Sequence, residues 1–129
     1  MVAFLSQEWL DAQAAALADV PPAPAANAVV QHVVTGAPSG NVSYTTSYSD
    51  GRVVAASLGT APDSPDLTVT ATYADAARLA TGELELSAAY MQGTVKVEGS
   101  MPALFALLPA THRPEFVAAI KSVGQTVEV

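Results

Sequence analysis

The segment 66–108 constrains the fold more than any other part of this chain. After the opening aspartate, residues 66–73 alternate between apolar side chains and threonine, which is the period-two pattern of a half-buried β-strand. Thr72 is placed to cap a helix over 73–81, and Gly82 suits the left-handed conformation that ends a helix. The sequence therefore predicts a strand that passes directly into a helix.

The second half of this segment predicts a helical turn, a strand and another helix. Ser87 can cap a single turn over 88–90, which ends at a glycine-containing stretch. Residues 94–98 alternate again and predict a strand. Ser100 can cap a helix over 101–108. We expect Pro109, the next residue, to break this helix.

The rest of the chain adds strands before this segment and a helix after it. Ser6 can cap a helix that runs to about Ala18, and its apolar residues recur at helical spacing. Asp50 and Gly51 form a hairpin signal. The other predicted elements are strands over 29–34, 42–48 and 52–58, a loop over 59–65, a helix over 111–123, and a tail over 125–129 that is disordered or adds an edge strand.

Five strands and their helices in this order predict an α+β fold. We expect a five-stranded, mainly antiparallel sheet with helices packed on one face. The 129 residues suit a single domain, 1–129, that can bury a core without disulfides or bound metal.

Composition excludes several classes of function. The chain has no cysteine, so disulfides, thiolate metal sites and cysteine nucleophiles are excluded, and a reducing cytoplasm is the expected compartment. A formal net charge of −7 with five Lys and Arg residues disfavours nucleic acid and anionic membranes as partners. No apolar run reaches the roughly 18 residues of an integral membrane segment.

The sequence offers little for catalysis or metal binding. His32 and His112 lack the spacing of a metal-ligating pair, and Ser39 does not lie in a Gly-x-Ser-x-Gly motif because position 37 is alanine. Glu83 and Glu85 could form an acid–base pair, but a solvated loop explains them as well. We therefore predict no catalytic residue, no metal ligand and no cofactor.

Two segments of the sequence resemble a known family. Residues 79–84 read Leu-Ala-Thr-Gly-Glu-Leu, and residues 89–101 read Ala-Tyr-Met-Gln-Gly-Thr-Val-Lys-Val-Glu-Gly-Ser-Met. At this separation they resemble the sterol carrier protein type two domain family, and the opening residues 4–10 resemble the first helix of its small bacterial members. Thr94 departs from that pattern, where lysine is usual, and nothing beyond Pro109 matches it.

The resemblance implies a tunnel between the sheet and the helices that holds a fatty acyl chain, a sterol or a similar lipid. The apolar residues that are candidates for its wall could equally fill an ordinary core, although methionine suits a cavity that accepts varied ligands. Gln92 is the candidate for the ligand head group, and Arg78 and Lys96 could attract an anionic head or remain solvated. The candidate wall residues are Leu79, Leu84, Tyr90, Met91, Val95, Val97, Met101, Leu104, Phe105, Leu108, Phe116 and Ile120.

Residues 110–129 form a candidate lid. Phe116, Val117 and Ile120 share an apolar face behind the proline at position 109, so we expect this helix to move as ligand enters and leaves. The tail 125–129 has no predicted role.

Taken together, these features predict a non-enzymatic, cytoplasmic and bacterial lipid carrier. Its partner would be a fatty acid, an acyl-CoA or a sterol. The alternative is an accessory module for substrate capture or dimerisation that acts with a separate lipid-metabolising enzyme. The sequence leaves the ligand and the oligomeric state open.

Overall fold

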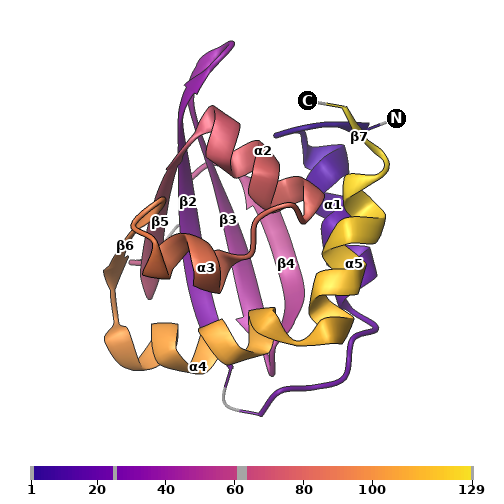
Figure 1. The fold of residues 1–129 in the computed structure, drawn as a ribbon, viewed down its shortest axis with the longest axis vertical. Helices are drawn as coiled ribbons and strands as arrows, with labels where there is room; N and C mark the ends of the chain where they lie inside the picture. The colour runs from indigo at the N-terminus through magenta and orange to yellow at the C-terminus, as the bar shows by residue number, and fades with distance from the viewer. Residues whose placement is uncertain (1, 25, 61–63, 129) are drawn as a thin grey trace.

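The computed structural model describes residues 2–24, 26–60 and 64–128, which form a curved sheet with helices on one of its faces (Figure 1). The predicted loop over 59–65 lies partly outside the described residues. The elements in chain order are β1 (Val2–Ala3), α1 (Gln7–Leu17), β2 (Ala28–Ala37), β3 (Gly40–Ser49), β4 (Arg52–Leu58), β5 (Leu67–Thr72), α2 (Tyr73–Thr81), α3 (Leu86–Met91), β6 (Lys96–Gly99), α4 (Met101–His112), α5 (Pro114–Gly124) and β7 (Val127–Glu128).

The main sheet has five strands in the described residues, in the order β4-β3-β2-β5-β6. The pair β2–β5 is parallel and the other neighbours are antiparallel. The mainly antiparallel α+β fold predicted from the sequence is confirmed. The parallel pair matters for the site, because it places β5 beside β2 with Val69 opposite His32.

Alternation decides which strand residues meet the helices. In β5, Leu67, Val69 and Ala71 are buried, as their period-two spacing predicts. A tight hairpin joins β3 to β4, where Asp50 and Gly51 both have positive φ, 51° and 77°. Such turns match the twist of the flanking strands, and the predicted hairpin is confirmed.

Side-chain caps start three of the helices. The hydroxyl oxygens of Ser6, Thr72 and Ser100 accept hydrogen bonds from backbone N–H groups three residues later, which satisfies donors that the first turn leaves free. Gly82 ends α2 with φ 81°. Gly82 also lies against Lys121 of α5, where an added Cβ would come within 2.4 Å of the lysine Cγ.

The starts of α3 and β6 differ from the prediction. Ser87 does not cap α3, because the helix begins at Leu86 and Glu85 is its N-cap residue. The strand β6 begins at Lys96 rather than at position 94. The backbone N–H groups of Thr94 and Val95 instead donate to the carbonyl oxygen of Ala89, so they close α3 and are not available to the sheet.

Pro109 does not break α4, which continues to His112. Proline removes one backbone donor from a helix, but Leu107 and Ala110 are buried on either side of it and hold the last turn against the core. The following helix therefore begins at Pro114 instead of position 111, and Pro114 occupies the first turn, where proline is tolerated.

The tail adds a strand, although not to the main sheet. β7 pairs in parallel with β1 near the start of the chain, and Figure 1 shows the two ends side by side. The main core lies between the sheet and the helical layer. A smaller cluster of Leu17, Val20, Val53 and Phe116 lies beside it.

Candidate functional site

A cavity of about 100 Å³ lies between the main sheet and the helical layer. This is several times the ~10–15 Å³ that one water molecule needs. His32 of β2, Tyr44 and Tyr48 of β3, and Val69 of β5 form its floor. The rest of the cavity wall comes from every helix of the described chain and from the α2–α3 connection. Its residues are Trp9, Gln13, Ala76, Leu79, Ala80, Gly82, Leu84, Glu85, Leu86, Thr111, Phe116, Val117 and Ile120.

Aromatic rings fix one side of this cavity. The ring of Trp9 meets Tyr44 edge to face, with centroids 5.3 Å apart, and meets Phe4 in the same way at 4.9 Å. The imidazole of His32 stacks on Tyr44 with centroids 4.4 Å apart and an angle of 8° between the planes. The register explains this stack, because His32 and Tyr44 are cross-strand neighbours in β2 and β3.

The polar groups of the floor carry no charge at neutral pH. Burial lowers the pKa of His32 to about 4 and raises the pKa of Tyr48 to about 12, an effect that a hydrogen bond with Thr46 partly offsets. Burial also raises the pKa of Tyr44. Nε2 of His32 lies 3.1 Å from Oγ1 of the buried Thr46. The cavity therefore joins apolar walls to neutral hydrogen-bonding groups.

Residues 7–107 match the model of the SCP-2 sterol transfer family. The chain belongs to this family. The match spans well over half of the chain and covers both segments on which the resemblance rests. Membership supports a lipid-binding or sterol-transfer role. The sequence matches no curated protein.

Solved structures share the fold of this SCP-2 family member. It superposes on a crystal structure of sterol carrier protein 2 with a TM-score of 0.72 and 19% identity, over 92% of this chain and 97% of that one. A conserved hypothetical protein from Thermus thermophilus gives a TM-score of 0.64 and 17% identity, over 93% and 89%. A palmitated sterol carrier protein 2-like protein from Aedes aegypti gives 0.62 and 20%, over 88% and 96%.

Four of the residues proposed from the sequence as cavity wall line this cavity. Leu79 and Leu84 come from α2 and the connection after it, and Phe116 and Ile120 come from α5. Val117, named with the candidate lid, lines it as well. The cavity thus lies where the family motif around Gly82 meets the last helix.

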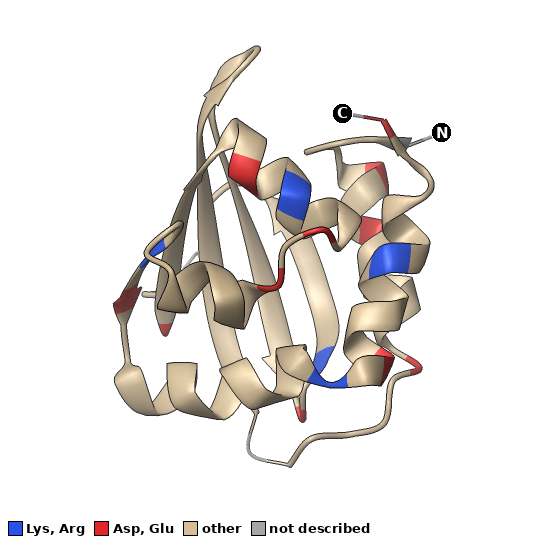
Figure 2. Ribbon diagram, viewed as in Figure 1, with Lys and Arg blue, Asp and Glu red and all other residues tan. Residues whose placement is uncertain are grey.

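The structure places the other candidate wall residues elsewhere. Val95 and Leu104 are buried in the core, and Tyr90, Val97 and Leu108 pack partly buried against it. Phe105 is 61% exposed and Met91 is 79% exposed, and Met101 is also exposed. These three lie on α4 and at the end of α3, and α4 contains no Asp, Glu, Lys or Arg (Figure 2).

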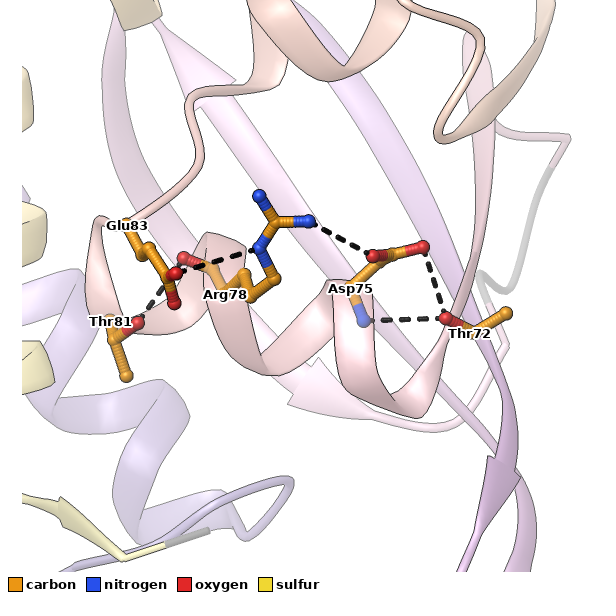
Figure 3. Close-up of polar contacts among 5 residues, drawn as sticks. All are labelled: Thr72, Asp75, Arg78, Thr81 and Glu83. Atoms are coloured by element: carbon orange, nitrogen blue, oxygen red, sulfur yellow. Dashed lines mark hydrogen bonds and ion pairs between the residues drawn. The ribbon is translucent and has the colours of Figure 1, made fainter.

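Gln92 and Arg78 lie together in a shallow surface groove between α2, α3 and His112. Figure 3 shows Arg78 between two carboxylates: its Nη1 is 3.4 Å from Asp75 and its Nε is 3.9 Å from Glu83. Lys96 pairs with Glu98 on β6 at 2.9 Å. Both candidate cations for an anionic head group therefore already have acidic partners.

The remaining candidates for chemistry lie apart. Nδ1 of His112 is 2.5 Å from Glu85 at the surface, whereas His32 lies on the cavity floor. Within the described ranges, no three His, Cys, Asp or Glu residues lie close enough together to hold a metal ion. In the same ranges, no helix is long and apolar enough to cross a membrane.

Sequence reasoning missed the floor of the cavity. Tyr44 and Tyr48 share one face of a predicted strand, and His32 lies in another predicted strand that is rich in valine. The alternation places these side chains on one face of each strand, but it does not say which face meets the helices. Trp9 faces the same space because α1 packs against the sheet, which local sequence does not determine.

Proposed function

We propose that this chain is a non-enzymatic lipid carrier that binds one ligand in the cavity between sheet and helices, and that residues 1–129 act as a single lipid-binding domain. The observation that carries the proposal is the cavity itself. Its lining is mainly apolar, and it occurs in a member of the SCP-2 sterol transfer family. The cysteine-free composition suits a reducing cytoplasm.

The transfer of the ligand's apolar surface from water into the cavity supplies the binding affinity. Each methylene buried in an apolar cavity contributes about 0.8 kcal/mol, so ten would contribute roughly 8 kcal/mol before the cost of association is subtracted. Because no bond has to be made or broken, binding and release need only burial and exposure of apolar surface. The palmitated relative of the same fold makes an acyl chain a reasonable first ligand to test.

The ligand requires the cavity to widen. A volume of about 150 Å³ holds a benzene-sized molecule, and this cavity, at about 100 Å³, is smaller. We infer that α5 acts as the lid, because Phe116, Val117 and Ile120 line the cavity from one helix near the end of the chain. Displacement of α5 would enlarge the cavity while the sheet stays in place.

Native mass spectrometry of the purified protein tests the carrier function, with organic extraction to identify what is bound. We expect a co-purifying lipid that added fatty acid or sterol displaces. The variant Ala80→Leu fills the cavity from α2, because Ala80 is buried and lines it, and it should lose at least tenfold in retained lipid.

Ala74→Leu is the matched control, since Ala74 is exposed on the same helix. It should retain lipid as the wild type does. A ligand-free mass with no uptake of fatty acid, acyl-CoA or sterol would contradict the proposal. The accessory module that acts with a separate lipid-metabolising enzyme would then be the better account.

A further inference from the structure

The cavity floor holds a connected group of polar side chains that apolar ligand binding alone does not require. His32 stacks on Tyr44 at 4.4 Å and lies within hydrogen-bond distance of Thr46 at 3.1 Å. Tyr48 faces the same space. Burying polar groups costs free energy unless they are hydrogen-bonded. Thr46 already pairs with Nε2 of His32 and with Tyr48, and the group can make further hydrogen bonds to a polar atom of a ligand.

A second observation points the same way. Trp9 lines the cavity, and its side chain is only 1% exposed. Its indole N–H is buried and has no hydrogen-bond partner in the described part of the chain. An indole N–H is a donor only, so a ligand oxygen near it would satisfy a group that is otherwise unpaired.

The charges around the cavity disfavour an anion. None of the described residues that line it is Lys or Arg, whereas Glu85 is among them. Arg52 donates to the carbonyl of Val20, and Arg113 donates to those of Pro21 and Ala110. Arg78 and Lys96 are in ion pairs. Lys121 is exposed and lies against Gly82, a residue of the cavity lining, so it is the cation that the test below removes.

We propose that the cavity selects lipids whose polar group is uncharged, a hydroxyl or a carbonyl, over fatty acid anions, and that His32 is the residue that sets this preference. The inference rests on the proposed carrier function and names its ligand class. A neutral imidazole can donate or accept one hydrogen bond, and Tyr44 holds the ring in place. A carboxylate in the same position would lose its water without gaining a counter-ion.

A matched pair of ligands tests this preference. The probe N-phenyl-1-naphthylamine, which is uncharged at pH 7.5, is displaced by 1-dodecanol or by dodecanoate, which have equal chain lengths. We expect the alcohol to bind wild-type protein at least tenfold more tightly than the acid. His32→Leu should weaken alcohol binding by about 3- to 10-fold, which corresponds to the loss of one hydrogen bond. His32→Gln should restore part of that loss because its amide also donates and accepts.

Thr70→Val is the control, because Thr70 lies on the other face of the sheet from Val69. It should leave both affinities unchanged. Equal affinity for alcohol and acid, or no effect of His32→Leu on the alcohol, would overturn the inference while the carrier function stands. Tighter binding of dodecanoate that is lost in Lys121→Gln would also overturn it. Failure of the probe and of both ligands to bind would instead contradict the carrier function.

Discussion

His32 lies in the cavity as a neutral side chain, and this has a consequence for stability. Burial lowers its pKa to about 4 in the folded protein, whereas an unfolded histidine has a pKa of about 6.5. Between these two values the unfolded chain binds a proton that the folded chain does not. The titratable groups that share the cavity with it are Tyr44, Tyr48 and Glu85.

The first prediction is that His32 makes the protein less stable as pH falls from about 6.5 toward 4. Above 6.5 neither state is protonated at His32, so its contribution is constant. At pH 5.0 the free energy of unfolding should have dropped by about 2 kcal/mol through His32 alone. Urea unfolding at pH 7.5 and pH 5.0 measures this drop.

The variant His32→Gln separates the contribution of His32 to the pH dependence from that of the carboxylates, because the carboxylates titrate in both proteins. The wild type should lose about 2 kcal/mol more than the variant between the two pH values. Equal losses would mean that His32 takes up its proton freely in the folded protein.

Single residues of the site were predictable where a motif surrounds them, or where they share the apolar face of a predicted helix, as Phe116 and Ile120 do. Leu79 and Leu84 flank the helix-ending Gly82, and both line the cavity. Met91 and Phe105 belong to equally apolar stretches but are exposed. Hydrophobicity indicates that a residue is suited to burial, but the direction of its side chain depends on how the helix is rotated against the sheet.

At the scale of elements, the sequence determined most helices through their first residues. Ser6, Thr72 and Ser100 cap α1, α2 and α4 as predicted, because capping depends on residues within one turn. Ser87 and Pro109 mislead because tertiary contacts override the local preference. The turn of α4 that contains Pro109 is held against the core by buried residues. The backbone N–H groups at the predicted start of β6 donate to a carbonyl of α3 and not to the sheet.

The lid proposal gives a prediction for α5. The end of α2 approaches α5 so closely that a Cβ at Gly82 would lie 3.4 Å from Cβ of Lys121, near the ~3.5–4.5 Å typical of disulfides. The double variant Gly82→Cys, Lys121→Cys should therefore cross-link α2 to α5. We expect ligand uptake and release, measured by stopped-flow fluorescence, to slow at least tenfold when the bond is oxidised.

The reduced form of the same variant is its own control, since the wild-type chain has no cysteine. Cys at position 82 adopts positive φ at a cost of about 1 kcal/mol, which both redox forms share. Exchange at the same rate in both forms would place the moving element elsewhere.

At the scale of the whole molecule, the parallel pairing of β2 with β5 builds the site. It brings His32 of β2 beside Val69 of β5, and β5 leads into α2, the helix that ends at Gly82. Periodicity predicted both strands, but which strands pair is a long-range choice that alternation does not encode. The fold class was therefore predictable, whereas the floor of the cavity was not.

The central claim is that a lipid enters this cavity, and the fluorescence of Trp9 tests it directly. Trp9 is the single tryptophan of the sequence and it lines the cavity, so its fluorescence reports on whatever occupies that space. Titration with a brominated fatty acid and a brominated fatty alcohol, whose bromine quenches tryptophan on contact, is the measurement. We expect saturable quenching by at least one of the two in wild type and in Ala74→Leu, and at least tenfold weaker binding in Ala80→Leu. Quenching that never saturates, or that is the same in Ala80→Leu, would show that the cavity is a closed core and not a lipid site.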